Sequence, residues 1–288
     1  MQAEPQADNA AQIEYWNGSA GAQWRARQEH QDTLLEPVSG ALLEAAAPRP
    51  GEHALDIGCG CGATTFDFAR ALAPNGDAIG VDVSTPMIDW ARTRAPSGLP
   101  VRFVLADATT YPFPVGATDL VVSRFGVMFF ADPAKSFANM RHALRPNGRM
   151  VFACWRAAKE NPWMILPLRA AAKYAPPLPE TNPDDPGPFS FANPDRVRTI
   201  LTEAGYADIV IEPRDVIIDV AASKGVEAAL ESALSIGPTH RILANQDEAV
   251  RAAASEEIRK EFAACAIGNS VPLAGAIWLV SARNPAAS

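Results

Sequence analysis

Two kinds of segment alternate along residues 51–155. Short apolar runs are separated by stretches in which apolar residues recur at helical spacing, and the runs fall at 53–57, 78–81, 101–105, 119–123 and 150–153. Apolar runs without polar alternation are typical of strands buried on both faces, with helices covering those faces. The pattern predicts a doubly wound, mostly parallel, Rossmann-like α/β sheet that binds ligands at the carboxyl ends of its strands.

The segments on either side of this core have other patterns of apolar residues. Helical spacing from Thr33 to Ala47, ended by Pro48 and Pro50, predicts a helical flap before the first strand. Two later runs, about 208–219 and 272–282, predict a strand pair that brings the sheet to seven strands. We therefore divide the chain into an N-terminal helical flap (1–50), a ligand-binding core (51–155), a cap insertion (156–193), a return of the core as helix and strand (194–220), a helical cap insertion (221–270), and a last core strand with a tail (271–288).

Charge and composition narrow the classes of partner. The net charge is −8 and the Lys and Arg residues are scattered, which argues against a nucleic-acid substrate. Residues 1–8 lack the basic start and apolar run of a signal peptide, and no apolar run is long enough to cross a bilayer. We expect a cytoplasmic protein that does not insert into a membrane. The four cysteines are too few for a disulfide framework, and no His, Cys and carboxylate cluster predicts a metal site.

The most informative stretch is Leu55-Asp56-Ile57-Gly58-Cys59-Gly60-Cys61-Gly62. It predicts a strand, a tight turn and the start of a helix, where free N–H groups can hold a nucleotide-like or anionic ligand. Gly58, Gly60 and Ala63 also satisfy the G-x-G-x-x-A form of the dinucleotide fingerprint, with Asp82 following at the end of the next strand. On this turn alone, a nicotinamide- or flavin-dependent oxidoreductase stays open.

A second, longer pattern includes the same turn. Its further motifs are Gly-Val-Asp-Val-Ser at 80–84, Ala-Asp-Ala at 106–108, Asp-Leu-Val-Val-Ser-Arg-Phe-Gly-Val-Met-Phe-Phe at 119–130 and Leu-Arg-Pro-Asn-Gly-Arg-Met-Val-Phe at 144–152. In this order and spacing, the chain resembles the class I S-adenosylmethionine-dependent methyltransferases. It is especially similar to bacterial small-molecule members of the ubiquinone/menaquinone-biosynthesis type. The resemblance covers about residues 54–155.

The resemblance implies a set of cofactor contacts. The glycine turn would cradle the methionine part of S-adenosylmethionine, with Asp56 near its amino group. Asp82 would bind the ribose hydroxyls and Asp107 the adenine amino group. The full expected set is Asp56, Gly58, Cys59, Gly60, Asp82, Val83, Met87, Asp107, Ala108 and Ser123, together with Trp24 from a flap that closes over the cofactor.

Few motifs mark the part of the site that would bind the methyl acceptor. Phe125, Met128, Phe129 and Trp163 are candidates for a substrate wall, and each could equally fill the core. Arg124 could touch substrate, hold the cofactor carboxylate or pair with an acid of a lid. The other weak candidates for a catalytic role are His30, Tyr174 and His240, because they fall in the expected flap and cap segments.

These patterns predict methyl transfer by in-line displacement to O, N, C or S of a small, apolar or aromatic molecule. The sulfonium donor is already activated, so alignment supplies most of the catalysis, and a base is needed only for a poorly acidic acceptor. Two alternatives stay open at this point. One is an NAD(P)-dependent Rossmann oxidoreductase, and the other is a cofactor-binding protein without catalysis.

Overall fold

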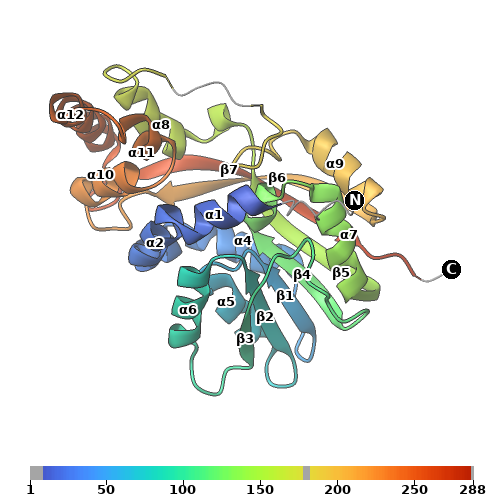
Figure 1. The fold of residues 1–288 in the computed structure, drawn as a ribbon. Helices are drawn as coiled ribbons and strands as arrows, with labels where there is room; N and C mark the ends of the chain where they lie inside the picture. Colours follow the sequence, from blue (N-terminus) through green and yellow to red (C-terminus); the bar gives the residue numbers. More distant parts are fainter. Residues whose placement is uncertain (1–8, 178–181, 287–288) are drawn as a thin grey trace, which may run out of the picture.

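The computed structural model describes residues 9–177 and 182–286, and its centre is a seven-stranded sheet (Figure 1). The strands are β1 (His53–Ile57), β2 (Asp77–Asp82), β3 (Val101–Leu105), β4 (Thr118–Arg124), β5 (Leu144–Trp155), β6 (Ala207–Asp219) and β7 (Pro272–Arg283). Their order is β3-β2-β1-β4-β5-β7-β6. The strands from β1 to β5 pair in parallel, and β7 lies antiparallel between β5 and β6. The expected Rossmann-like sheet is confirmed.

The two faces of the sheet follow from side-chain alternation along β4. Leu120 and Val122 pack with the helices α4 (Glu36–Ala46) and α5 (Ala63–Leu72), in a cluster that includes Phe68. Val121 points to the opposite face. There α7 (Pro133–Ala143) inserts Phe137, whose ring lies 5.5 Å from that of Phe152. Helix α9 (Pro194–Glu203) packs beside α7, and α6 (Thr85–Arg94) covers the end of the sheet at β3 (Figure 1).

Two expected local structures differ from the observed ones. The single helix expected at 33–47 is two helices, α3 (Gln28–Leu34) and α4, because Pro37 at the start of α4 has no N–H to continue the preceding helix. The stretch Arg145-Pro146-Asn147-Gly148, whose residue types favour a turn, lies inside β5, where the pairing with β4 shifts register between Thr118 and Leu120. Asn147 has a φ of 63° at this irregularity. Residues typical of a turn therefore produce a local distortion within a strand.

Two groups of helices, the flap and the cap, cover the carboxyl end of the sheet. The flap consists of α1 (Ala10–Asn17), α2 (Ser19–Ala26) and α3, and α2 packs on α6. The cap consists of α8 (Pro162–Ala171), α10 (Val226–Ser235), α11 (Pro238–Leu243) and α12 (Glu248–Cys265), which pack on one another (Figure 1). Short 3₁₀ turns lie at Gly126–Phe129 and Ala158–Glu160. In the described part of the chain, no helix is both long and apolar enough to cross a bilayer.

Candidate active site

The glycine turn after β1 is a close-packed backbone cradle. Gly58, Gly60 and Gly62 have φ values of 68°, 54° and 87°, which side-chain-bearing residues rarely adopt. A β-carbon on Gly58 would lie 2.5 Å from the Gly126 α-carbon, and one on Gly62 would lie 2.7 Å from the Phe103 ring. The turn therefore brings bare backbone to the cavity and opens directly into the N-terminus of α5.

Asp82 lies beside this turn at the end of β2. Its two carboxylate oxygens accept hydrogen bonds from the Gly60 N–H at 2.8 Å and the Ser84 N–H at 2.9 Å. The side chain is buried but lines the cavity, so the carboxylate can also accept hydrogen bonds from a ligand. Burial raises the pKa of Asp82, and the N–H donors oppose that rise. The carboxylate is thus fixed in orientation before any ligand arrives.

Asp107, after β3, is held by the flap. Its Oδ1 accepts from the Asn9 side-chain amide at 2.8 Å and from the Thr109 N–H at 2.9 Å. The Asn9 side-chain amide also donates to the Thr109 hydroxyl, and its Oδ1 accepts a hydrogen bond from the Ala131 N–H. Asn9 is 4% exposed and lines the cavity, so the start of the flap is tied to the edge of the site.

Asp56 and Ser123, both expected to contact the cofactor, lie behind the turn. Asp56 is 1% exposed and accepts from the Thr65 hydroxyl at 2.7 Å, and burial raises its pKa to about 7. Ser123 donates to the Ile57 carbonyl at 2.7 Å and accepts from the Gly126 N–H at 3.1 Å. Neither side chain is among those lining the cavity. In this geometry both residues hold the turn in place.

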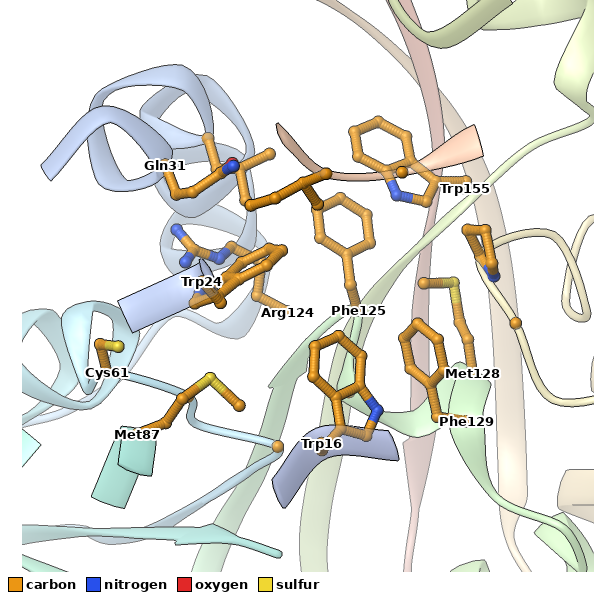
Figure 2. Close-up of a pocket in the computed structure, with 18 of the residues that line it drawn as sticks. Trp16, Trp24, Gln31, Cys61, Met87, Arg124, Phe125, Met128, Phe129 and Trp155 are labelled. Carbon is orange, nitrogen blue, oxygen red and sulfur yellow. The ribbon is translucent and has the colours of Figure 1, made fainter. Parts of the chain in front are cut away.

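The cavity itself has a volume of about 450 Å³ and runs from the glycine turn to the cap. Figure 2 shows part of its lining, with side chains from the flap, the glycine turn and the segment after β4. The cavity is lined by nine of the eleven expected cofactor residues, namely Trp24, Gly58, Cys59, Gly60, Asp82, Val83, Met87, Asp107 and Ala108, and by all four expected substrate residues, Phe125, Met128, Phe129 and Trp163. Burial raises the pKa of the lining Cys61 to about 12, so it faces the cavity as a neutral thiol. Among the described residues, no group of three or more His, Cys, Asp or Glu is arranged to hold a metal ion.

Of the four weak catalytic candidates, only Arg124 lines the cavity. His30 is buried between the flap and the segment after β6. Its Nε2 has no hydrogen-bond partner, and burial lowers its pKa. The His240 ring bonds the Leu234 carbonyl, and Tyr174 is exposed on the outside of the cap. These three side chains do not lie among the lining residues.

The cap end of the cavity has an aromatic wall. The Phe125 ring stacks on Trp155 with centroids 4.0 Å apart, and Trp163 lies 5.0 Å beyond Trp155. Phe125 has a φ of 70°, a strained conformation for a bulky residue, and its N–H bonds the Ala153 carbonyl. The backbone between β4 and the following 3₁₀ turn thus fixes this ring in the cavity.

The flap and the cap meet over the cavity. The Trp16 ring makes edge contacts with Trp24 and Phe129, with centroids 6.2 and 5.3 Å apart. Arg27 of the flap donates to Glu231 on α10 at 2.8 Å. The cavity is therefore enclosed by segments that lie about 200 residues apart in the chain (231 − 27 = 204).

Sequence reasoning did not single out several lining residues. These are Asn9, Gln31 and Asp32 from the flap, Trp155 from the end of β5, Arg241 from α11 and Phe262 from α12. None stands in a motif, and only the spacing of apolar positions around them signals a helix or a strand. Their meeting depends on how the flap and cap fold back over the sheet.

Comparisons with known proteins agree with this geometry. A family model described as a methyltransferase domain matches residues 54–148. The chain is 32% identical over 186 residues to nocamycin O-methyltransferase of Saccharothrix syringae, covering 61% of this chain and 66% of that protein. It is 30% identical over 178 residues to demethylmenaquinone methyltransferase of Beutenbergia cavernae, covering 59% and 71%. Of several other relatives, the match spans only 32% to 55% of their length.

The fold also has solved counterparts. The YcgJ protein of Bacillus subtilis superposes with a TM-score of 0.55 over 86% of this chain and 98% of its own, at 18% sequence identity. At that identity the likeness concerns the fold alone. The fold described above therefore has a known architecture.

Proposed function

The chain belongs to the S-adenosylmethionine-dependent methyltransferases, and we propose that it methylates a small, apolar or aromatic acceptor held at the cap end of its cavity. One observation carries the proposal. A single cavity joins the glycine turn and the strand-end acids Asp82 and Asp107 to the aromatic wall around Phe125 and Trp155. A donor site and an acceptor site in one enclosure are what group transfer requires.

The residues present fit the cofactor. Gly58 and Gly60 line the cavity without a β-carbon, so a ligand can approach the backbone of the turn closely. The Asp82 carboxylate is oriented by backbone N–H donors and lines the cavity, which suits acceptance of hydrogen bonds from ribose hydroxyls. Asp107, on the neighbouring strand end, suits an amino group such as that of adenine.

The methyl donor, a sulfonium, supplies the activated methyl group when bound. The protein then has to align the acceptor with it and exclude water, and such alignment can contribute roughly 7–11 kcal/mol. Trp16 and Trp24 of the flap close the cavity above the turn. Their aromatic faces can also stabilise a cation.

The lining favours an acceptor that needs no protein base. Over residues 9–177 and 182–286, none of the lining side chains is His, Glu or Lys. The lining aspartates Asp32, Asp82 and Asp107 already accept hydrogen bonds from neighbouring groups. We therefore propose an acceptor whose nucleophilic atom is acidic enough to ionise in water, such as a phenol, an enol or a carboxylic acid.

The test is methyl transfer from S-[methyl-³H]adenosylmethionine to a panel of phenols, hydroxyquinones, aromatic carboxylic acids and amines. We expect turnover with ionisable aromatic acceptors and none with simple amines. Equilibrium binding of S-adenosylhomocysteine and of NADH would be measured alongside. Binding of NADH without binding of S-adenosylhomocysteine would contradict the methyltransferase function, and binding without turnover across the panel would favour a non-catalytic cofactor-binding protein.

A further inference from the structure

Two polar side chains beside the glycine turn face the cavity with unused hydrogen-bonding capacity. Gln31, on α3, is 6% exposed and lines the cavity, and its amide makes no hydrogen bond to any described residue. Arg124, at the end of β4, donates from Nη1 to the Ser39 hydroxyl at 2.6 Å. No carboxylate within the described ranges forms a salt bridge with it. Both side chains line the cavity, so a ligand bound there can use this unused hydrogen-bonding capacity.

A carboxylate lies in the same corner. Asp32 follows Gln31 on α3 and also lines the cavity. Its Oδ2 accepts from Arg94 at 2.8 Å and from the Gln28 amide, while its Oδ1 has no partner among the described residues. In Figure 2, Gln31, Arg124 and Trp24 lie together on the side of the glycine turn, and Trp155, Met128 and Phe129 lie on the other side.

Both signs of charge meet in this corner. The acids Asp32, Asp67 and the buried Asp56 lie near enough to Arg124 to interact with its charge. Cys61, Ala63 and Thr64 of the α5 N-terminus complete the lining, and N–H groups at a helix N-terminus favour anions. A simple anion would be repelled by the acids and a simple cation by Arg124. A zwitterion matches both.

The order of the strands indicates which zwitterion fits. In the sheet, β3, β2, β1 and β4 are neighbours in that order. Their carboxyl ends carry, in turn, Asp107, Asp82, the glycine turn and Arg124. A ligand whose adenine and ribose lie at the first two positions reaches the last two with its amino-acid end.

We propose that Arg124 and Gln31 bind the carboxylate of the cofactor's amino-acid end and that Asp32 binds its ammonium group. The inference rests on the proposed function, since it takes S-adenosylmethionine as the cofactor. It assigns to Asp32 the contact that the motif resemblance implied for Asp56, which is buried behind the turn. Two of the three groups come from the flap, so binding the amino-acid end also ties α3 to the core.

The test compares three ligands by calorimetry on the full chain. S-adenosylhomocysteine has both groups, its decarboxylated analogue keeps only the amine, and 5′-methylthioadenosine lacks the amino-acid end. We expect S-adenosylhomocysteine to bind the native protein about tenfold or more tightly than the decarboxylated analogue, the range for hydrogen bonds to a charged group. Arg124→Met and Gln31→Leu should remove most of that preference and leave 5′-methylthioadenosine binding unchanged.

Asp32→Asn should weaken binding of the decarboxylated analogue and leave binding of 5′-methylthioadenosine unchanged. The matched control is Arg251→Met on the exposed side of α12, which should bind all three ligands as the native protein does. If Arg124→Met also loses 5′-methylthioadenosine, the variant is misfolded at the turn and Gln31→Leu decides.

Different results overturn different claims. Equal affinity of the native protein for S-adenosylhomocysteine and its decarboxylated analogue would overturn this inference and leave the proposed function standing. Unchanged S-adenosylhomocysteine affinity in Arg124→Met would overturn the assignment of Arg124 to the cofactor carboxylate. Arg124 would then be assigned to acceptor binding. Failure of the native protein to bind any of the three would instead overturn the proposed function.

Discussion

Gly58 lies against Gly126 so closely that a β-carbon on either residue would fall within 2.7 Å of the other's α-carbon. This contact joins the turn after β1 to the segment after β4. It therefore sets the distance between the glycine cradle and the aromatic wall that begins at Phe125.

Gly126→Ala is expected to disrupt this contact. The added methyl group would meet the Ile57 carbonyl at 2.6 Å and the Gly58 α-carbon at 2.7 Å, so the turn must move. We expect a loss of about 1–3 kcal/mol in the free energy of unfolding, as for overpacked cores, and weaker S-adenosylhomocysteine binding. Urea denaturation and calorimetry would measure the two effects. Gly40→Ala in α4, where nothing lies within 4 Å, is the control and should not destabilise.

Asp82→Ala is expected to weaken cofactor binding more than tenfold, because the variant loses charge-assisted hydrogen bonds of about 1.5–3 kcal/mol. The Gly60 and Ser84 N–H groups also lose their acceptor, so some loss of stability should accompany it. Calorimetry with S-adenosylhomocysteine measures the affinity. Asp77→Ala, at the opposite end of β2 and away from the cavity, should leave binding unchanged. Equal affinity of Asp82→Ala and the native protein would contradict the ribose assignment.

Asp56 is expected to make stability depend on pH. Burial raises its pKa from 3.8 to about 7, so the folded state binds this proton more tightly than the unfolded state does. The contribution of Asp56 to stability is therefore complete below about pH 4 and is lost as the pH rises toward 7, at up to about 1.4 kcal/mol for each pH unit. Asp56→Asn should remove this dependence. Urea denaturation at several pH values between 4 and 8 would measure it, and identical slopes for the two proteins would refute the prediction.

Asn9→Asp is expected to release the start of the flap. The new carboxylate would face Asp107 where the Asn9 amide now donates at 2.8 Å, and it would leave the Thr109 hydroxyl without its donor. We expect faster proteolytic cleavage in residues 9–34 and slower cleavage when S-adenosylhomocysteine is added. Asn75→Asp adds the same charge in an exposed turn and serves as the control. Equal cleavage rates for the two variants would show that Asn9 does not anchor the flap.

Local patterns were sufficient to predict the sheet and to select residues most of which line one cavity. Each parallel strand lies in an apolar run, and the strand-end acids Asp82 and Asp107 face the cavity because parallel strands end at one edge. The same reasoning could not show whether the Asp56 side chain contacts a ligand. Whether that carboxylate points forward or back depends on Thr65, nine residues later, which holds it from behind the turn.

Only part of the corner formed by Gln31, Asp32 and Arg124 could be predicted from the sequence. Arg124 stands in the 119–130 motif, and holding the cofactor carboxylate was one of its expected roles. Gln31 lies 93 positions earlier (124 − 31 = 93) and stands in no motif. On a helix, Gln31 has the pattern of an ordinary surface residue. Only the folding of α3 over the turn turns it toward the cavity. The tertiary arrangement therefore carries this information.

The position of β7 has a consequence for how the protein is made. This strand, Pro272–Arg283, is inserted between β5 and β6, so β6 has no neighbour in the sheet until the ribosome has synthesised residue 283. The half of the sheet from β3 to β5 can assemble during translation, whereas the other half must wait. During that interval, the inner edge of β5 and the strand β6 present unpaired backbone groups that could bind other chains. Chaperone protection during synthesis would matter most for this part of the molecule.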